Sequence, residues 1–366
     1  MSAARKIMKL YEPLTMRRGG VLHGAQVAYE TWGELSLAAD NAVLIFTGLS
    51  PDAHAASSPA NPAPGWWEEM VGPGKPIDSD RFYVICVNSL GSCFGSTGPL
   101  SINPASGRPY GPDFPTLSVE DIAAAARAAL LQMGIPRLRA VVGPSLGGMS
   151  ALAYALQFPD AVDNMLNISS AVHALPFAIA VRSLQRELIR SDPAWRDGRY
   201  EPGKGPIQGM RLARKLGMIS YRSAAEWRQR FGRARAADDA PGRGGPYGVE
   251  FAIEAYLEVH AQRFVGGFDA NCYLQLSRAM DLFDAAEHGE TLEAAFAKLR
   301  LKRALVIGVE TDFLFPPDQQ EQLARLLDRG AREVEFVRLP SLQGHDSFLI
   351  DIERFGPVVR NFMSRL

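Results

Sequence analysis

The sequence has 366 residues, which is enough for one large domain with an insertion or for two domains. Its 47% hydrophobic and 22% charged residues are ordinary for a globular protein, and a formal net charge of −1 gives no electrostatic reason to expect a nucleic acid as partner. No stretch approaches the roughly 20 apolar residues that a membrane span needs, and no signal peptide is visible. We therefore expect no nucleic-acid and no membrane partner.

The cysteines are few and odd in number. Cys86, Cys93 and Cys272 lack the spacing of metal ligands, so we expect reduced thiols in the core and no metal site. This cysteine usage favours a cytoplasmic protein.

In chain order, short β-branched runs first alternate with helical stretches. Strands are predicted at residues 26–31, 42–46, 82–87, 139–142 and 165–168. Ser118, followed three residues later by Asp121, is predicted to cap an alanine-rich helix that runs to about Met133. This alternation predicts a mostly parallel central sheet that is flanked by helices.

From about Val172 to Glu290 the strand pattern is absent. Helices with amphipathic spacing are predicted here at residues 175–190, 209–217, 224–231, 250–264 and 271–283, with a polar surface loop at 233–246. Strands at 304–309 and 334–339 and helices at 318–327 and 352–364 follow. We predict one α/β core domain formed by residues 1–171 and 291–366, which carries residues 172–290 as a helical lid insertion.

The segment Gly143-Pro144-Ser145-Leu146-Gly147 has the Gly-x-Ser-x-Gly pattern of a nucleophile elbow. An apolar strand precedes it and a run of helix formers follows it, so Ser145 is expected at a strand-to-helix turn. Such a turn requires small residues beside the serine. Ser145 is therefore the candidate nucleophile.

A serine hydroxyl needs a base, and the chain has only six histidines. His345 follows the last predicted strand, and Asp312 follows the strand before it. The order Ser145, Asp312, His345 is the one that the α/β-hydrolase fold uses for its catalytic triad. We therefore predict this fold, with His345 as base and Asp312 as the acid that orients it.

Two backbone amides are expected to form the oxyanion hole. The amide of Leu146 lies at the start of the helix after Ser145, and the amide of Leu49 lies in the loop after the strand at 42–46. Both would stabilise the negative charge of a tetrahedral intermediate.

Short motifs along nearly the whole chain match one known family in order and spacing. They include Asp52-Ala53-His54, Gly65-Trp66-Trp67, Gly72-Pro73-Gly74-Lys75, Gly95-Ser96-Thr97-Gly98-Pro99, Tyr110-Gly111-Pro112-Asp113-Phe114-Pro115, Phe231-Gly232-Arg233, Phe268-Asp269-Ala270-Asn271 and Gly344-His345-Asp346. The sequence therefore resembles the homoserine O-acetyltransferase family of the α/β-hydrolase fold. This resemblance implies ping-pong transfer of an acyl group from acyl-CoA to the hydroxyl of a small amino acid, with no metal and no permanently bound cofactor.

The resemblance also implies roles for residues outside the triad. Arg214 matches the family's arginine for the amino-acid carboxylate, and Asp346 matches the residue that receives the ammonium group. Family members often form a two-fold interface with their lids, so a homodimer is expected.

Several positions resemble the serine O-succinyltransferase branch of the family more than its acetyltransferases. The run Leu49-Ser50-Pro51-Asp52-Ala53-His54 departs from the acetyltransferase pattern at Ser50 and Pro51. Pro51 and its neighbours Asp52, Ala53 and His54 are expected to narrow the acceptor end of the pocket. Relatives that use succinyl-CoA with homoserine have an arginine where this chain has Leu314. Arg182, with Arg186 as second choice, is the expected substitute, because a buried succinyl carboxylate needs a cation.

Three other functions stay open at this point. An acetyl donor becomes more favourable if Arg182 is an exposed helix arginine, which would make the chain a homoserine O-acetyltransferase that uses acetyl-CoA. A plain esterase would hydrolyse thioesters without an amino acid. A non-catalytic binding protein would normally have lost a triad residue, and none is missing here.

Overall fold

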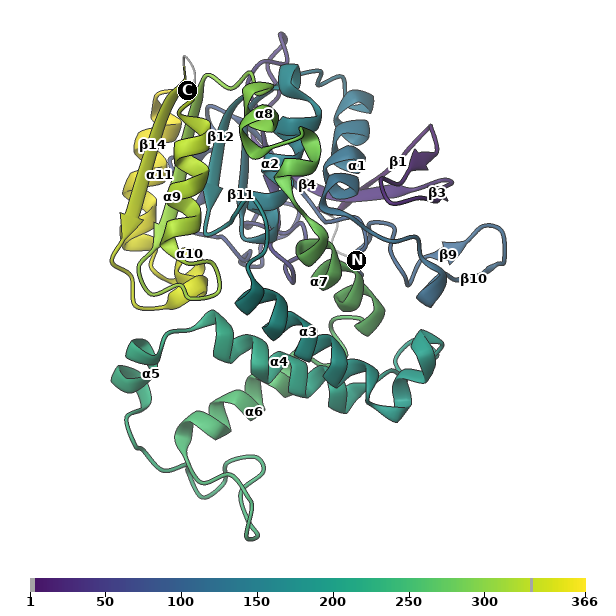
Figure 1. Ribbon diagram of the computed structural model, residues 1–366, viewed down its shortest axis with the longest axis vertical. Helices are drawn as coiled ribbons and strands as arrows, with labels where there is room; N and C mark the ends of the chain where they lie inside the picture. The colour runs from purple at the N-terminus through teal and green to yellow at the C-terminus, as the bar shows by residue number, and fades with distance from the viewer. Residues whose placement is uncertain (1–3, 330–331) are drawn as a thin grey trace.

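The computed structural model describes residues 4–329 and 332–366 and is built around one eight-stranded sheet (Figure 1). In spatial order its strands are β1 (Lys6–Lys9), β4 (Gln26–Trp32), β8 (Tyr83–Val87), β5 (Ala42–Phe46), β11 (Leu138–Pro144), β12 (Val162–Ile168), β13 (Arg303–Val309) and β14 (Glu333–Leu339). From β8 to β14 the strands are parallel, and β4 and β1 extend one edge in antiparallel fashion.

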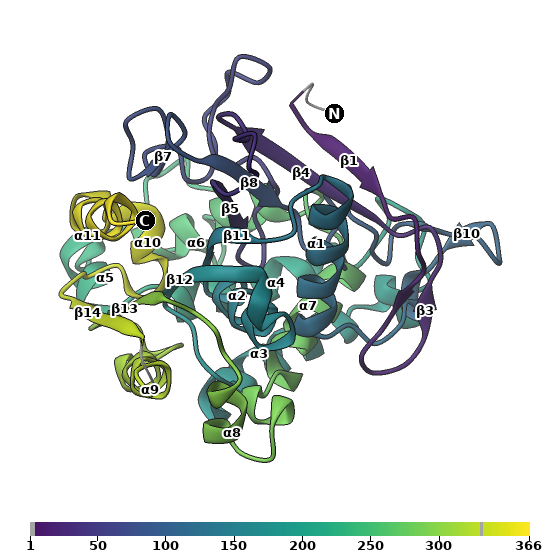
Figure 2. The same cartoon turned by 90° about the horizontal axis from the view of Figure 1, so that it is seen from above.

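Helices cover both faces of this sheet (Figure 2). One face carries α1 (Val119–Gln132), α2 (Leu146–Gln157), α8 (Leu292–Ala297) and α9 (Pro317–Leu327), and the other carries α11 (Ile352–Ser364). Neighbouring residues of β5 enter opposite cores, since Leu44 packs on the α1–α2 side and Ile45 on the α11 side. All of β5 is buried, as expected for a central strand of a parallel sheet.

The secondary structure agrees with the patterns in the sequence. Each predicted strand coincides with an observed one to within three residues at either end, and Ser118 and Asp121 form the expected capping box of α1. The edge strand β1 was not predicted, because its short, largely exposed Lys6–Lys9 run lacks an apolar pattern. Three small two-stranded sheets were also missed: β2 (Leu14–Thr15) with β3 (Val21–Leu22), β6 (Val71–Gly72) with β7 (Ile77–Asp78), and β9 (Ile102–Asn103) with β10 (Arg108–Pro109).

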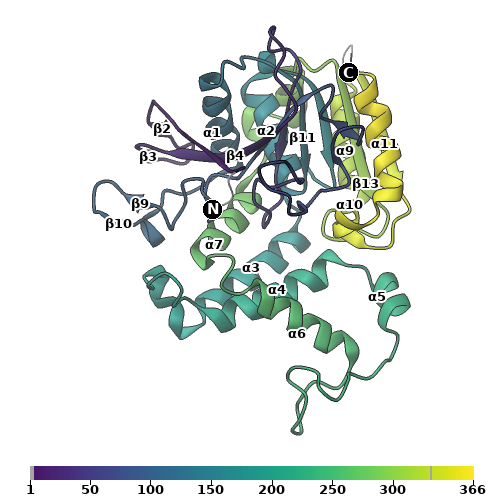
Figure 3. The same cartoon turned by 180° about the vertical axis from the view of Figure 1, so that it is seen from behind.

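A helical insertion between β12 and β13 lies across the edge where the parallel strands end (Figures 1 and 3). It contains α3 (Pro176–Arg190), α4 (Ile207–Tyr221), α5 (Ala224–Phe231), α6 (Ala252–Phe264) and α7 (Ala270–Leu282). Helix α3 packs on α4 and α7, and α4 packs on α6. The described residues contain no helix that is long and apolar enough to span a membrane.

Candidate active site

The loops that follow four parallel strands meet beneath the helical insertion. Ser145 follows β11, Asp312 follows β13, His345 follows β14, and residues 48–51 follow β5. Parallel strands bring their carboxyl ends to one edge of the sheet, and loops at this edge form binding sites in open α/β folds. Side chains far apart in sequence therefore come together here.

Ser145 lies in a strained turn between β11 and α2. Its backbone φ of 56° and ψ of −122° lie outside the regions that non-glycine residues prefer. A Cβ atom on Gly143 would lie 2.0 Å from the carbonyl oxygen of Gly147, and one on Gly147 would lie 2.3 Å from that of Phe46. Both glycines are therefore needed for the backbone to pass close enough to form this turn.

Three side chains form a continuous hydrogen-bonded chain. His345 Nε2 lies 2.8 Å from Ser145 Oγ, and His345 Nδ1 lies 2.7 Å from Asp312 Oδ2. All three residues are buried. This geometry allows the imidazole to remove the serine proton while the carboxylate stabilises the resulting imidazolium.

The aspartate and the imidazole are each held from a second direction. Asp312 Oδ1 accepts hydrogen bonds from the amides of Leu314, at 3.0 Å, and Phe315, at 2.9 Å. The ring of Phe315 stacks on His345 with its centroid at 5.1 Å and an interplanar angle of 23°. These contacts fix the carboxylate and the ring in the orientation that faces Ser145.

The two residues predicted to supply the oxyanion hole belong to the helix after Ser145 and to the wall of its cavity. Leu146 is the first residue of α2, so its N–H belongs to the helix turn whose donors have no acceptor within the helix. Leu49 lines the same cavity as Ser145. Both positions suit donors to an oxyanion that forms on a carbonyl carbon bonded to Ser145.

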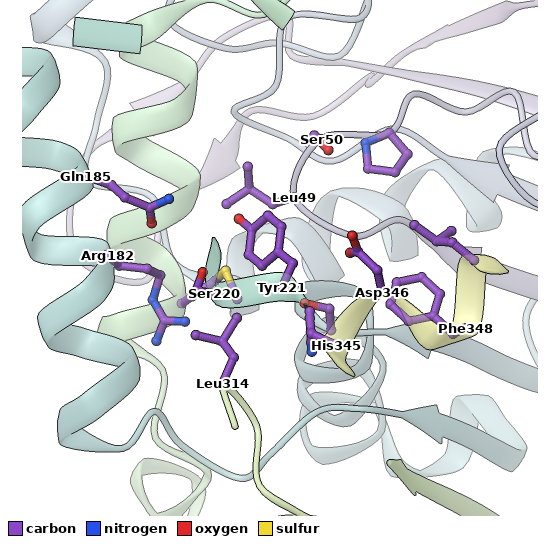
Figure 4. Close-up of a pocket in the computed structure, with 15 residues that line it drawn as sticks. Leu49, Ser50, Arg182, Gln185, Ser220, Tyr221, Leu314, His345, Asp346 and Phe348 are labelled. Atoms are coloured by element: carbon purple, nitrogen blue, oxygen red, sulfur yellow. Dashed lines mark hydrogen bonds between the residues drawn. The ribbon is translucent and has the colours of Figure 1, made fainter. Parts of the chain in front are cut away.

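The helical insertion forms one wall of the cavity that contains Ser145 (Figure 4). The insertion contributes polar groups and one methionine, and the core contributes mostly apolar side chains. The lining residues are Gly48, Leu49, Ser50, Pro51, Ser145, Arg182, Gln185, Ser220, Tyr221, Met280, Leu314, His345, Asp346, Phe348 and Leu349. A small cavity of this composition can hold an acyl chain and a small polar acceptor while it excludes bulk water.

Arg182 is a buried cation in the wall of this cavity. Its side chain points from α3 toward Leu314 (Figure 4), and its Nε lies 2.5 Å from Asp281 Oδ1. Among the residues that the structure describes, neither Nη1 nor Nη2 of Arg182 has a hydrogen-bond partner. Two donors of a buried guanidinium are therefore free to receive an anion in the cavity.

Asp346 also lines the cavity and is half-buried. Burial raises the pKa of Asp346, while electrostatic interactions with His345, Arg222 and Arg214 oppose this rise. Its nearest ion-pair partner is Arg222, with Nη1 at 3.9 Å from Asp346 Oδ2. The carboxylate is therefore only weakly paired and can accept a cationic ligand.

Arg214 lies outside the set of residues that line the cavity. Its guanidinium packs over the ring of Phe264, 4.5 Å from the centroid, and its Nε has no hydrogen-bond partner in the described part of the chain. In this arrangement a ligand in the cavity contacts Arg214 only if the arginine side chain shifts.

Of the four residues expected to narrow the acceptor end, the structure brings only Pro51 to the cavity. Asp52 lies instead in an ion pair with Arg5, at 2.9 Å. The His54 ring lies between Glu30 and the carbonyl of Ala63, both at 2.8 Å, and Ala53 is buried. Asp52, Ala53 and His54 therefore do not line the pocket themselves, and their contacts hold the loop that places Pro51.

Arg186 does not line the cavity either. Its Nη1 lies 2.7 Å from Asp281 Oδ2 and donates to Ser277 Oγ at 2.9 Å. Arg186, the second choice for the donor carboxylate, therefore does not face the cavity. Its Nη1 contacts Asp281 and Ser277 instead.

Sequence reasoning missed several residues of this site, of which two contact predicted ones. Tyr221 lines the cavity beside His345, with the ring centroids 6.0 Å apart, and Asp281 anchors Arg182. Tyr221 ends α4 and Asp281 lies near the end of α7. Neither lies in a local catalytic motif, so only the packing of the insertion could have revealed them.

A family model described as the alpha/beta hydrolase fold matches residues 41–351 of the chain. This match includes the nucleophile turn, the aspartate and the histidine described above. The chain therefore belongs to the α/β-hydrolase fold family.

Relatives narrow the assignment within this fold. The chain is 57% identical to a serine O-succinyltransferase of Litchfieldella anticariensis over 100% of this chain and 99% of the relative. It is 55% identical to an L-serine/homoserine O-acetyltransferase of Streptomyces lavendulae over 99% and 97%. A homoserine O-acetyltransferase structure from Bacillus anthracis superposes with a TM-score of 0.89 at 28% identity, over 98% of this chain and 97% of that one. The protein is thus an acyltransferase of the family that contains these enzymes.

Proposed function

We propose that this protein transfers a succinyl group from succinyl-CoA to the hydroxyl of L-serine through an acyl intermediate on Ser145. The observation that carries the choice of donor is the buried Arg182, which lines the cavity that contains Ser145 and whose Nη1 and Nη2 have no hydrogen-bond partner in the described part of the chain. An acetyl donor has no group that would satisfy them. The names of the two similar relatives support acyl transfer to serine but differ in the donor.

In the first half of the reaction, Ser145 Oγ attacks the thioester carbonyl while His345 Nε2 takes its proton. The amides of Leu49 and Leu146 stabilise the oxyanion. When the intermediate collapses, the carbon–sulfur bond breaks and His345 returns the proton to the leaving thiolate. CoA departs and an ester remains on Ser145.

In the second half, L-serine enters the space that the pantetheine thiol has left. Asp346 receives its ammonium group, and Arg214 its carboxylate after a shift of the side chain toward the cavity. His345 then removes the proton from the substrate hydroxyl, which attacks the ester. When this intermediate collapses, the bond between the acyl carbon and Ser145 Oγ breaks and His345 returns the proton to Oγ. The products are O-succinyl-L-serine and the free enzyme.

The other features expected from the sequence belong to this proposal as well. No permanently bound cofactor is needed, because acyl-CoA is consumed as a substrate. We place the reaction in the cytoplasm, where acyl-CoA is formed, and expect a homodimer.

The donor assignment is tested by replacing the cation. We expect Arg182→Leu to lower the ratio of kcat/KM for succinyl-CoA to that for acetyl-CoA by roughly 100-fold, because losing hydrogen bonds from a charged group to a buried carboxylate removes about 1.5–3 kcal/mol. The measurement is CoA release with each donor and with L-serine or L-homoserine as acceptor. A ratio within twofold of the unmodified enzyme would reject Arg182 as the donor site.

The same grid separates this function from homoserine O-acetyltransferase. If the unmodified enzyme prefers acetyl-CoA and L-homoserine, these two substrates replace the proposed pair. CoA release without any amino acid would indicate a hydrolase.

Asp346→Asn is expected to impair the second half alone. The rate constant for succinyl transfer from the preformed acyl enzyme to L-serine should fall roughly tenfold or more, because a charge-assisted hydrogen bond to the ammonium group is lost.

A pH dependence follows from the same residue. Since the pKa of Asp346 is raised, its carboxylate becomes protonated at a higher pH than that of an ordinary aspartate. As the pH falls, the unmodified enzyme should therefore lose affinity for serine at a higher pH than an ordinary aspartate would allow, and the variant should lack this component. Stopped-flow CoA release and acyl-enzyme decay check both points; slower acylation with unchanged transfer would contradict them.

A further inference from the structure

Arg182 belongs to a cluster of three charged side chains between α3 and α7. Arg182 Nε contacts one oxygen of Asp281 at 2.5 Å, and Arg186 Nη1 contacts the other at 2.7 Å. The exposed fractions of the Arg182 and Asp281 side chains are 5% and 8%, so this pair is screened little by solvent. The two arginines lie one helical turn apart on α3, so a single carboxylate can bridge them.

The two arginines play different parts in this cluster. Arg182 lines the cavity, and across residues 4–329 and 332–366 its terminal nitrogens find no hydrogen-bond acceptor. Arg186 lies behind it, where Nη1 also donates to Ser277 Oγ. The cluster thus has one arginine that lines the substrate cavity with unpaired nitrogens and a second that is anchored by Asp281 and Ser277 and does not line the cavity.

The balance of charge follows from these contacts. Two guanidinium groups and one carboxylate leave a net charge of +1. Without Arg186, the carboxylate of Asp281 would neutralise Arg182, and a donor carboxylate would enter a neutral site at a desolvation penalty. With Arg186 present, one positive charge remains for an anion.

We propose that Arg186 is a positioning residue that sets donor specificity through Asp281. By balancing the charge of Asp281, it leaves Arg182 as a net cation with two free donors for the terminal carboxylate of a dicarboxylic acyl-CoA. This inference rests on the proposed role of Arg182 in binding that carboxylate. Arg186 itself does not touch the donor.

The test compares Arg186→Gln with Arg186→Lys. Arg186→Gln should lower the ratio of kcat/KM for succinyl-CoA to that for acetyl-CoA by about tenfold, since it removes one charge close to a buried ligand. Arg186→Lys keeps the charge and should hold the ratio within about threefold of the unmodified enzyme. Both donors are measured on the same preparation, so a loss of folded protein cancels in the ratio.

Two double variants separate charge from structure. In Arg186→Gln with Asp281→Asn, the net charge returns to +1 and the asparagine oxygen can still accept from Arg182 Nε, so the succinyl preference should recover. In an Arg182→Leu background, Arg186→Gln should change the ratio less than about twofold, because coupled residues are not additive.

The outcomes also distinguish this inference from the function on which it rests. An unchanged ratio in Arg182→Leu alone would reject the donor site itself. A lowered ratio in Arg182→Leu together with no change in Arg186→Gln would reject only the role of Arg186. Equal losses in Arg186→Gln and Arg186→Lys, or a loss that persists in the Arg182→Leu background, would assign Arg186 a purely structural role.

Discussion

Replacement of Ser145 by alanine is expected to lower kcat for CoA release by about 10⁶-fold, as for the removal of a triad nucleophile. The acyl group would then have no oxygen to which it can be transferred, although the amides of Leu49 and Leu146 remain in place. His345→Ala should have a similar effect, and the double variant should be no slower than either single variant, because the two side chains act as one unit. Steady-state CoA release with succinyl-CoA and L-serine measures all three.

Thermal unfolding provides the control for these variants. Alanine at position 145 keeps the left-handed backbone and adds no atoms, so we expect the unfolding midpoint to change little. A Ser145→Ala enzyme that folds normally and retains more than about a hundredth of the original rate would show that another group accepts the acyl chain.

The second large effect is expected for Asp312→Asn, with a fall in kcat of about 10⁴-fold. Asp312 Oδ1 accepts from two backbone amides and Oδ2 faces His345 Nδ1. An asparagine satisfies those amides with its oxygen, so its NH₂ group must face Nδ1. The imidazole proton then moves to Nε2, and the ring can no longer accept the proton of Ser145.

This prediction is specific to chemistry rather than binding. Both half-reactions should slow in Asp312→Asn, while the dissociation constants for donor and acceptor should change little. Single-turnover measurements of acylation and of transfer to serine check this expectation. A loss of less than about tenfold would show that His345 is oriented without the carboxylate.

The parts of the site that could be predicted are those encoded in local sequence. Gly143, Ser145 and Gly147 lie within five residues. Because the close backbone packing of this turn requires glycine at positions 143 and 147, the turn leaves a short motif that can be recognised in the sequence. Asp312 and His345 were found because each follows a predicted strand, and parallel strands end at one edge of the sheet. Local patterns likewise predicted the central strands and most helices.

The parts that could not be predicted depend on how distant segments pack. Arg182 was expected to contact the donor, but its partner Asp281 lies on another helix 99 residues away. The position of Arg186 behind that carboxylate follows only from the packing of α3 on α7. For His54 the local sequence was misleading. It lies in a family motif that was expected to narrow the pocket, yet its ring bonds to Glu30 on β4.

The most direct test of the account is the mass of the intact enzyme after mixing with succinyl-CoA in the absence of an amino acid. We predict a mass increase of one succinyl group, located on the peptide that contains Ser145 and removed when L-serine is added. Absence of this adduct, with CoA released only once serine is present, would contradict an acyl-enzyme mechanism. The same adduct on Ser145→Ala would place the intermediate on another residue.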